Sequence, residues 1–420
     1  MPYKPDDLRK AIELLLDIPD IKVEEVVETR DGNYLVTAVS TKKGTECHTC
    51  GKHINAPYGS GEWITLRHLS IFGKEVYIRL RMPKYRCDTC DGNPTTTQRA
   101  SWFEPKSGHT KAFEKHILLA CVNSTISDVS IKEGIGYGAI EGIIDREIAK
   151  EVEWKKIPRL DVLGIDEISL KKGHKDFVVI VTGRIGGRTV ILGVLKDRLK
   201  TTVKGFLSSI PKRLQRSIQY VCSDMYDGYI NASKEVFGKR VQIVVDRFHV
   251  AKLYRDGFET LRKKELRRLK KELSEKAYKE LKGAMWILRK KHEDLSEDDK
   301  KVLEKLFGYS PVLKQAYVFR DELTAIFDEK ISKPQAKQKL NGWIARIKRS
   351  GIRCFDDFIK TLGARKDEIA NYFSGRHTSG FVEGLNNKIK VIKRRCYGIF
   401  NTESLFQRIY LDLHGYSLYL

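Results

Sequence analysis

Apolar residues recur with two different spacings along the chain, and the change of spacing divides it into parts. In the first hundred residues they alternate with polar residues, as in NYLVTAV (33–39) and EVYIRLRM (75–82). A period of two predicts half-buried strands. From about residue 108 to 150 the spacing becomes three to four, which predicts three short helices. Their segments are KAFEKHILLACV, TISDVSIKEGI and YGAIEGIIDREIAKEV. These proportions are typical of a helix-turn-helix unit, although an ordinary small helical bundle has the same pattern.

Apolar runs with strand character return between residues 161 and 246. Five of them occur in sequence: DVLGIDEI, FVVIVTG, TVILGVL, IQYVCSD and VQIVVD. The turn GRIGGR (183–188) joins the second run to the third as a hairpin. Helical stretches at 200–210 and 226–238 separate the last three runs. Three strands followed by alternating helix and strand predict a mixed sheet with helices on its faces, in the order of the ribonuclease H-like fold.

Residues 250–370 are highly charged and helical in spacing, and a last helix is expected to begin near Glu383. The patterns together predict a multidomain α+β protein. No apolar run has the length of a membrane span, and the first ten residues, MPYKPDDLRK, have no signal-peptide pattern. A soluble, cytoplasmic protein with no membrane partner is therefore expected.

The formal net charge of the 420-residue chain is +23. Such an excess favours a polyanionic partner such as DNA, because the release of counterions from phosphates drives binding. A generally basic protein with no nucleic-acid partner has the same composition, so charge alone identifies no activity.

Four of the eight cysteines form two CxxC pairs, C-x2-C-x36-C-x2-C, at Cys47, Cys50, Cys87 and Cys90. Two such turns together supply four thiolates for a tetrahedral structural zinc ion. A pair of disulfides or four unrelated thiols are the alternatives, and an intracellular setting disfavours disulfides. Basic residues around the pairs suggest that this module touches DNA: Lys42, Lys43, Lys52, Arg67, Lys84 and Arg86.

Asp166 and Asp224 each follow an apolar strand segment. In the predicted sheet these strands are parallel neighbours, which brings the two carboxylates to one edge. Like charges at that separation are unfavourable unless divalent cations neutralise them. For either aspartate alone, an ordinary strand-end turn is the simpler interpretation. Glu167, Asp227 and Asp246 compete as ligands, and Asp246 and His249 are candidates for a supporting role.

Glu383 is the only acidic residue between Gly375 and Thr402. At about 100° per residue it shares a helix face with Asn387, Lys390 and Arg394, opposite an apolar stripe. A carboxylate for metal, followed by cations for phosphates, fits one DNA-binding edge. The alternative is a helix N-terminal acid that the helix dipole favours.

Several blocks of the chain resemble those of the DDE transposases of the ISL-three family of insertion sequences. The CxxC pairs are similar to the zinc finger of that family, and the helices after them to its helix-turn-helix. GIDEISLKKGH and VCSDMYDGY resemble the blocks with its two catalytic aspartates. VVDRFHVAKL and WILRKKHEDLSEDDKKVLEKL resemble later blocks. SGRHTSGFVEGLNNKIKVIKRR resembles the block with its catalytic glutamate.

The resemblance implies a catalytic triad of Asp166, Asp224 and Glu383 that holds two Mg²⁺ (or Mn²⁺), besides one structural Zn²⁺. It implies that DNA phosphates are bound by a set of polar and basic residues: Arg376, His377, Asn387, Lys388, Lys390, Lys393, Arg394 and Arg395. The implied domains are a zinc finger (1–105), a helix-turn-helix (108–150), a ribonuclease H-like catalytic domain (158–254 and 371–420) and an α-helical insertion (255–370).

The implied activity is that of a transposase that binds terminal inverted repeats, cleaves there and joins the 3′ ends to target DNA. A homodimer or larger assembly on paired ends, associated with the bacterial nucleoid, is expected. Two alternatives remain: a DNA-binding regulator with an inactive catalytic domain, and a metal-dependent nuclease without strand transfer.

Overall fold

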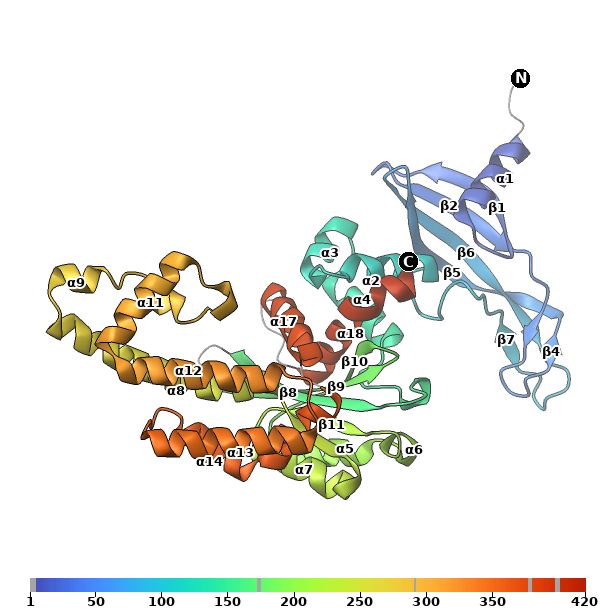
Figure 1. Ribbon diagram of the computed structural model, residues 1–420. Coiled ribbons are helices and arrows are strands. Elements are labelled where there is room, and N and C mark those ends of the chain that lie inside the picture. Colours follow the sequence, from blue (N-terminus) through green and yellow to red (C-terminus); the bar gives the residue numbers. More distant parts are fainter. Residues whose placement is uncertain (1–4, 172–174, 291, 377–379, 397–400) are drawn as a thin grey trace. The chain divides into compact units, whose positions relative to one another are not determined.

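The computed structural model describes residues 5–171, 175–290, 292–376, 380–396 and 401–420 (Figure 1). The chain divides into two compact units. The first comprises Met1–Ile148 with Tyr410–Leu420, and the second comprises Ala149–Ile409. No helix in these described ranges combines the length and the apolar character needed to cross a membrane.

The first unit contains a sheet of strand order β1-β2-β6-β5. Its strands are β1 (Ile21–Glu28), β2 (Tyr34–Ser40), β5 (Ala56–Ile71) and β6 (Lys74–Arg86), and β7 (Thr95–Thr97) pairs with β6. The alternating residues Val76, Ile78 and Leu80 of β6 are fully buried, as the period of two predicts. Helix α1 (Pro5–Leu16) adds Leu16 to the same core.

The three predicted helices of the first unit are α2 (Lys111–Cys121), α3 (Ile126–Glu133) and α4 (Tyr137–Glu147). Threonine caps begin two of them: Thr110 accepts a hydrogen bond from the N–H of Phe113, and Thr125 accepts one from the N–H of Asp128. Gly134 ends α3 in the left-handed conformation that glycine adopts without strain. Their apolar stripes close a separate core.

The second unit contains a five-stranded mixed sheet of order β10-β9-β8-β11-β12. Strands β8 (Val162–Lys171), β9 (Lys175–Ile185) and β10 (Arg188–Leu195) are antiparallel, and the pairs β8–β11 and β11–β12 are parallel. The parallel strands are short: β11 (Tyr220–Ser223) and β12 (Gln242–Val245). The predicted strand order and mixed sheet are confirmed.

Helices cover both faces of this sheet (Figure 1). On one face, α5 (Lys200–Ser209) and α7 (Asp227–Phe237) pack on Leu163, Ile165 and Val221. On the other, the first turns of α8 (Arg247–Glu272) pack on Val162, Cys222 and Val244. Neighbouring residues of one strand thus face opposite cores, which explains why these strands read as continuous apolar runs.

Helices alone follow α8 in the described residues, as the charged helical pattern predicts. Three long helices, α8, α12 and α13, pack side by side (Figure 1). The helices from α9 onward are α9 (Glu275–Lys279), α10 (Ala284–Ile287), α11 (Glu297–Tyr309), α12 (Pro311–Asp328), α13 (Lys333–Ser350), α14 (Asp356–Ala364), α15 (Lys366–Ala370), α16 (Tyr372–Gly375), α17 (Gly380–Arg395) and α18 (Thr402–Tyr419). Helix α17 returns to the sheet and contacts β8.

Candidate metal centres

The four cysteines of the CxxC pairs meet at one end of the long β5–β6 hairpin. Cys47 and Cys50 lie in the turn between β3 (Thr45–Glu46) and β4 (His53–Ile54), and Cys87 and Cys90 follow β6. All four Sγ atoms lie within 4.8 Å of one another. This is the one group of three or more potential ligands that comes together so closely among the described side chains.

Their spacing fits a tetrahedral zinc site. The Sγ–Sγ distances are 4.0 Å for Cys47–Cys90, 3.8 Å for Cys50–Cys87 and 3.6 Å for Cys87–Cys90. Four thiolates about 2.3 Å from one zinc ion would lie about 3.8 Å apart. Cys47, Cys50, Cys87 and Cys90 form no disulfide, so the disulfide alternative is not borne out. Hydrogen bonds from Thr89 lower the pKa of the Cys87 thiol to about 6, whereas the contact with Cys50 raises that of Cys90 to about 12. Of these two thiols, Cys87 is therefore the one that more readily supplies the thiolate that zinc binds.

His48, next to Cys47, and Arg67, eleven residues along β5 from the end that meets the cysteines, both have structural partners. The Nδ1 atom of His48 lies 2.9 Å from the Thr96 hydroxyl. Arg67, expected to touch DNA, is buried instead, because it pairs with Glu75 and lies 5.2 Å from the ring of Phe113.

The second candidate centre lies where β8 and β11 run in parallel. Ile165 pairs with Ser223, and the next residues of the two strands are Asp166 and Asp224. The two aspartates therefore occupy the same end of this strand pair, as predicted. One detail differs from the sequence prediction: β8 continues beyond Asp166 to Lys171, because its far half pairs with β9.

Both aspartates are partly buried and have specific hydrogen bonds. Asp166 accepts one at Oδ1 from the N–H of Glu167 (2.8 Å), and Asp224 accepts one from the N–H of Tyr226 (2.9 Å). The pKa of Asp166 is raised to about 6, mainly by burial and in part by the nearby Asp224. Burial also raises the pKa of Asp224. An uncompensated pair of buried carboxylates is the electrostatic environment that a divalent cation stabilises.

Two of the competing carboxylates, Glu167 and Asp227, have side-chain partners of their own. Glu167 accepts a hydrogen bond from the Tyr229 hydroxyl (3.3 Å) and pairs with Arg198 (3.4 Å). Asp227 pairs with Arg365.

The two candidate supporting residues lie close to the aspartate pair. Asp246 caps the start of α8 by accepting a hydrogen bond from the N–H of Phe248 (3.1 Å), and it raises the pKa of Asp166. His249 has the opposite effect on both Asp166 and Asp224 and lowers their pKa values. A supporting electrostatic role for these two residues stays a prediction.

Helix α17 is bonded to β8 at two points. The side-chain amide of the buried Asn386 donates to Oδ2 of Asp166 at 2.6 Å, and Nζ of Lys393 donates to the carbonyl of Ser169 at 2.6 Å. The predicted apolar stripe is confirmed, since Leu385, Ile389 and Ile392 are buried. Glu383 lies in the same helix, but its side chain is outside the described residues.

The predicted DNA-binding residues differ in their surroundings. Asn387, Lys388, Lys390 and Arg394 are exposed, whereas Lys393 and Arg395 are half-buried. Arg376 donates to the carbonyl of Asp328 at 3.1 Å. His377 lies outside the described residues. No structural observation tests their contact with DNA.

Helix α4 is the third helix of the predicted helix-turn-helix, the position of the helix that would enter the major groove. Its exposed residues include Glu141, Asp145 and Glu147. Its one basic residue, Arg146, pairs with the buried Glu114 at 2.6 Å. This charge pattern does not favour contact with phosphates along the whole helix.

Comparison with known protein families gives three matches in the same order as these structural parts. A family model described as a transposase matches residues 163–409, more than half of the chain. The zinc finger of the transposases of IS204, IS1001, IS1096 and IS1165 matches residues 43–90. The helix-turn-helix domain of transposase family ISL3 matches residues 98–148.

The chain belongs to the ISL3 family of transposases. The match to the zinc finger of these transposases supports zinc as the metal of the four cysteines. A helix-turn-helix domain implies DNA binding, and a DDE transposase domain implies a divalent metal ion.

Comparison with individual proteins shows similarity to transposases over nearly the whole ISL3 chain. It is 26% identical to the transposase for insertion sequence element IS1001 of Bordetella parapertussis, over 88% of this chain and 89% of that protein. It is 24% identical to the transposase for insertion sequence element IS1557 of Mycobacterium tuberculosis, over 95% of this chain and 93% of that protein.

Asn386 is the site residue that sequence reasoning missed in this ISL3 transposase. Positions 386 and 387 lie about 60° and 40° to either side of Glu383 around a helix, so helix geometry does not separate them. The burial of Asn386 could have been inferred from its position, because Asn386 directly follows Leu385, a residue of the apolar stripe. A buried amide needs a hydrogen-bond partner, and here the partner is Asp166.

Proposed function

We propose that this chain is the transposase of an insertion sequence, which binds the terminal inverted repeats of its element, cleaves there and joins the freed 3′ ends to target DNA. Support comes from the family and from the similarity over nearly the full length to two insertion-sequence transposases. The proposal also assigns the zinc finger and the helix-turn-helix to recognition of the element ends.

The placement of Asp166 and Asp224 is the observation that carries this proposal. Both follow paired residues of the parallel strands β8 and β11, and both have raised pKa values in their partly buried positions. Carboxylate oxygens are the ligands that Mg²⁺ prefers, so the two aspartates fit Mg²⁺ or Mn²⁺. The proposed catalytic domain consists of 158–254 and 371–420.

Glu383 is proposed as the third carboxylate. Two hydrogen bonds attach α17 to β8, one of them directly to Asp166. Position 383 lies three residues before Asn386, and residues three apart are neighbours on a helix surface. This arrangement favours Glu383 over any acid of the helical insertion as the partner of the two aspartates.

In the proposed reaction, water breaks the P–O3′ bond at the element end and leaves a 3′-hydroxyl. This hydroxyl then attacks a phosphodiester of the target, so one P–O bond forms as another breaks. Bound divalent ions supply a lowered pKa for the attacking group and charge stabilisation for the leaving oxygen. The carboxylates hold the ions, Asn386 orients Asp166, and the exposed Lys388, Lys390 and Arg394 hold phosphates.

The test is a cleavage and joining assay with a DNA duplex that carries the element ends, in Mg²⁺. Outer-shell partners of metal ligands typically contribute about 10- to 100-fold, so we expect loss of a ligand to cost more than about 100-fold. Glu383→Gln should therefore lose cleavage and joining together, with DNA binding kept. Glu403→Gln is the matched control, because Glu403 is an exposed glutamate of α18.

The other outcomes of this assay identify the alternatives. Binding of the ends without any metal-dependent cleavage by the wild-type chain supports a regulator. Cleavage without a joined product supports a nuclease. A Glu383→Gln variant that cleaves and joins like wild type contradicts the proposed triad.

A further inference from the structure

We infer that the exposed side of helix α8, in the helical insertion, is a second binding surface for duplex DNA. It binds the phosphate backbone, and this binding does not depend on the base sequence. We call it the α8 basic face and define it as Lys263, Lys264, Arg267 and Lys271. The inference rests on the proposed DNA-processing function, and it adds a surface separate from the zinc finger, the helix-turn-helix and α17.

Helical spacing gathers these four side chains. Lys263, Arg267 and Lys271 succeed one another at four-residue intervals, and Lys264 adjoins them, so all four lie on one side of α8. All four are exposed. Together with Thr260 and Arg268 they line a shallow hollow on the surface. The opposite side of the helix is buried through Phe258, Arg262 and Leu269.

Missing ion pairs distinguish this surface from an ordinary charged helix. None of its four cations forms a hydrogen bond or an ion pair with any residue that the structure describes. Four exposed lysines elsewhere in the insertion are paired: Lys300 with Glu297, Lys301 with Asp298, Lys305 with Glu280 and Lys339 with Glu329. Each of those lysines has an acid in contact, whereas among the described residues the α8 basic face has only the longer-range attraction between Lys264 and the neighbouring Glu265.

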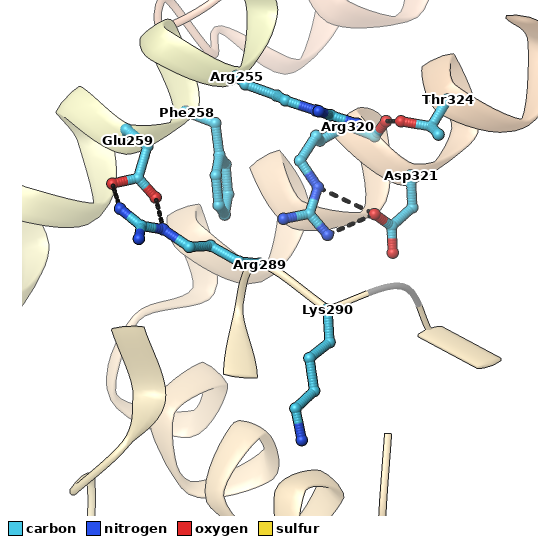
Figure 2. A pocket seen from close by; sticks show the side chains of 8 residues that line it. All are labelled: Arg255, Phe258, Glu259, Arg289, Lys290, Arg320, Asp321 and Thr324. Carbon is cyan, nitrogen blue, oxygen red and sulfur yellow. Dashed lines mark hydrogen bonds and ion pairs between the residues drawn. The ribbon is translucent and has the colours of Figure 1, made fainter. Parts of the chain in front are cut away.

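A cavity on another side of α8 also contains cations, but most of these are paired with acids. This cavity of about 300 Å³ is lined by both cations and acids (Figure 2). Arg289 pairs with Glu259, and Arg320 pairs with Asp321 (Figure 2). Lys290, at the same cavity, pairs with Asp299 (2.6 Å). Most of the positive charge at this cavity is therefore neutralised within the protein, which disfavours it as a site for a polyanion.

Like charges four residues apart destabilise an isolated helix, so the α8 basic face carries an electrostatic cost that an anionic partner would remove. The face extends over about 12 Å of helix axis between Lys263 and Lys271. Duplex DNA offers one negative charge per about 1.7 Å of its own axis, which matches a linear row of cations. Lysine and arginine contacts to phosphates carry no base information, so the bound DNA need not contain the element ends.

The test compares two fourfold glutamine variants of the full chain. One variant is K263Q/K264Q/R267Q/K271Q. The control, K300Q/K301Q/K305Q/K339Q, removes the same number of charges at paired positions. Glutamine is a good helix former, so both variants keep helical propensity. The affinity for a duplex of arbitrary sequence is measured between 50 and 200 mM KCl.

We expect the slope of log K against log salt to become shallower by up to about 3.6 in the α8 variant, or about 0.9 per lost phosphate contact. Its affinity at the low-salt end should fall at least about ten-fold relative to the control. An α8 variant with the slope and affinity of the control overturns the inference and leaves the proposed function standing. A wild-type chain that binds neither this duplex nor the element ends contradicts both.

Lysine acetylation of the wild-type chain gives a readout that does not depend on a variant. Addition of the arbitrary duplex should protect Lys263, Lys264 and Lys271 and leave Lys300 and Lys301 reactive. Equal reactivity of all five lysines with and without duplex overturns the inference. Protection by a single-stranded RNA but not by the duplex overturns the assignment to duplex DNA.

Discussion

At the scale of single residues, the amide of Asn386 joins helix α17 to Asp166. The side chain is 3% exposed, and its Nδ2 donates to Oδ2 of Asp166 at 2.6 Å. Its Oδ1 is buried with no hydrogen-bond partner in the described part of the chain. Asn387, the next residue, is exposed. The pair therefore offers two chemically identical side chains, only one of which orients a proposed metal ligand.

Asn386→Ala should lower the affinity of the cleavage site for Mg²⁺, whereas Asn387→Ala should not. Loss of an outer-shell partner typically costs about 10- to 100-fold in metal affinity or activity, so the half-saturating Mg²⁺ concentration should rise by that order. The measurement is the cleavage rate as a function of Mg²⁺ for both variants. Equal Mg²⁺ curves for the two variants would contradict a positioning role for Asn386.

At the scale of elements, the four-cysteine turns have little apolar support of their own. Their buried cluster contains Cys47, Ile54, Tyr85 and Cys87, whereas the β1-β2-β6-β5 sheet has a separate and larger core. A small core of this kind needs the metal to fold, because ligand binding and folding are then one process.

Removal of zinc by a chelator should therefore unfold the four-cysteine turns, here called the tip, and leave the β1-β2-β6-β5 sheet intact. Amide hydrogen exchange should rise in residues 45–54 and 87–97 and stay slow in the buried strand residues Val76, Ile78 and Leu80. Cys50→Ser should have the same local effect without a chelator. Uniform exchange over the whole first unit, or no change at the tip, would contradict this division.

His68 links three elements of the first unit and predicts a pH dependence. Its Nε2 lies 3.0 Å from the carbonyl of Leu16, and its Nδ1 lies 2.9 Å from the Thr110 hydroxyl, which also caps α2. Burial lowers the pKa of His68 from its ordinary value of 6.5. The imidazole of His68 therefore binds a proton less readily in the folded state than in the unfolded state, where it is protonated below about pH 6.5.

Because the folded pKa of His68 is the lower one, its neutral form stabilises the fold above the unfolded pKa. The free energy of unfolding of the first unit should fall as the pH drops below about 6.5, by at most about 1.4 kcal/mol per unit for this group. Denaturant unfolding of wild type and His68→Gln at pH 7.5 and 5.5 measures it. The variant should lose less stability between the two pH values, and an equal loss would contradict the assignment.

At the scale of the whole molecule, the local pattern predicted the second sheet because its order is encoded in consecutive segments. The runs DVLGIDEI and IQYVCSD are strongly apolar, and the alternation of strand and helix after β10 leaves few ways to pair them. The four-cysteine site could also be predicted from the sequence, because each CxxC turn brings two ligands close together. The division into four domains stays a prediction.

Contacts between distant parts of the chain were beyond the local pattern. The bond between Asn386 and Asp166 joins residues more than 200 positions apart, and the helix sequence indicates its buried side but not the strand that this side meets. Arg67 was taken for a surface cation, because its partner Glu75 lies on the neighbouring strand. Both cases depend on tertiary packing, which decides the burial of a polar side chain.

Asp166, Asp224 and Glu383 are proposed to hold the same divalent ions. Iron-mediated cleavage tests this proposal most directly, because Fe²⁺ substituted for Mg²⁺ generates hydroxyl radicals that cut the peptide chain beside the bound metal. We expect cuts close to all three positions, and each should disappear in excess Mg²⁺. Cuts near Asp166 and Asp224 without one near Glu383, or cuts that excess Mg²⁺ leaves unchanged, would contradict it.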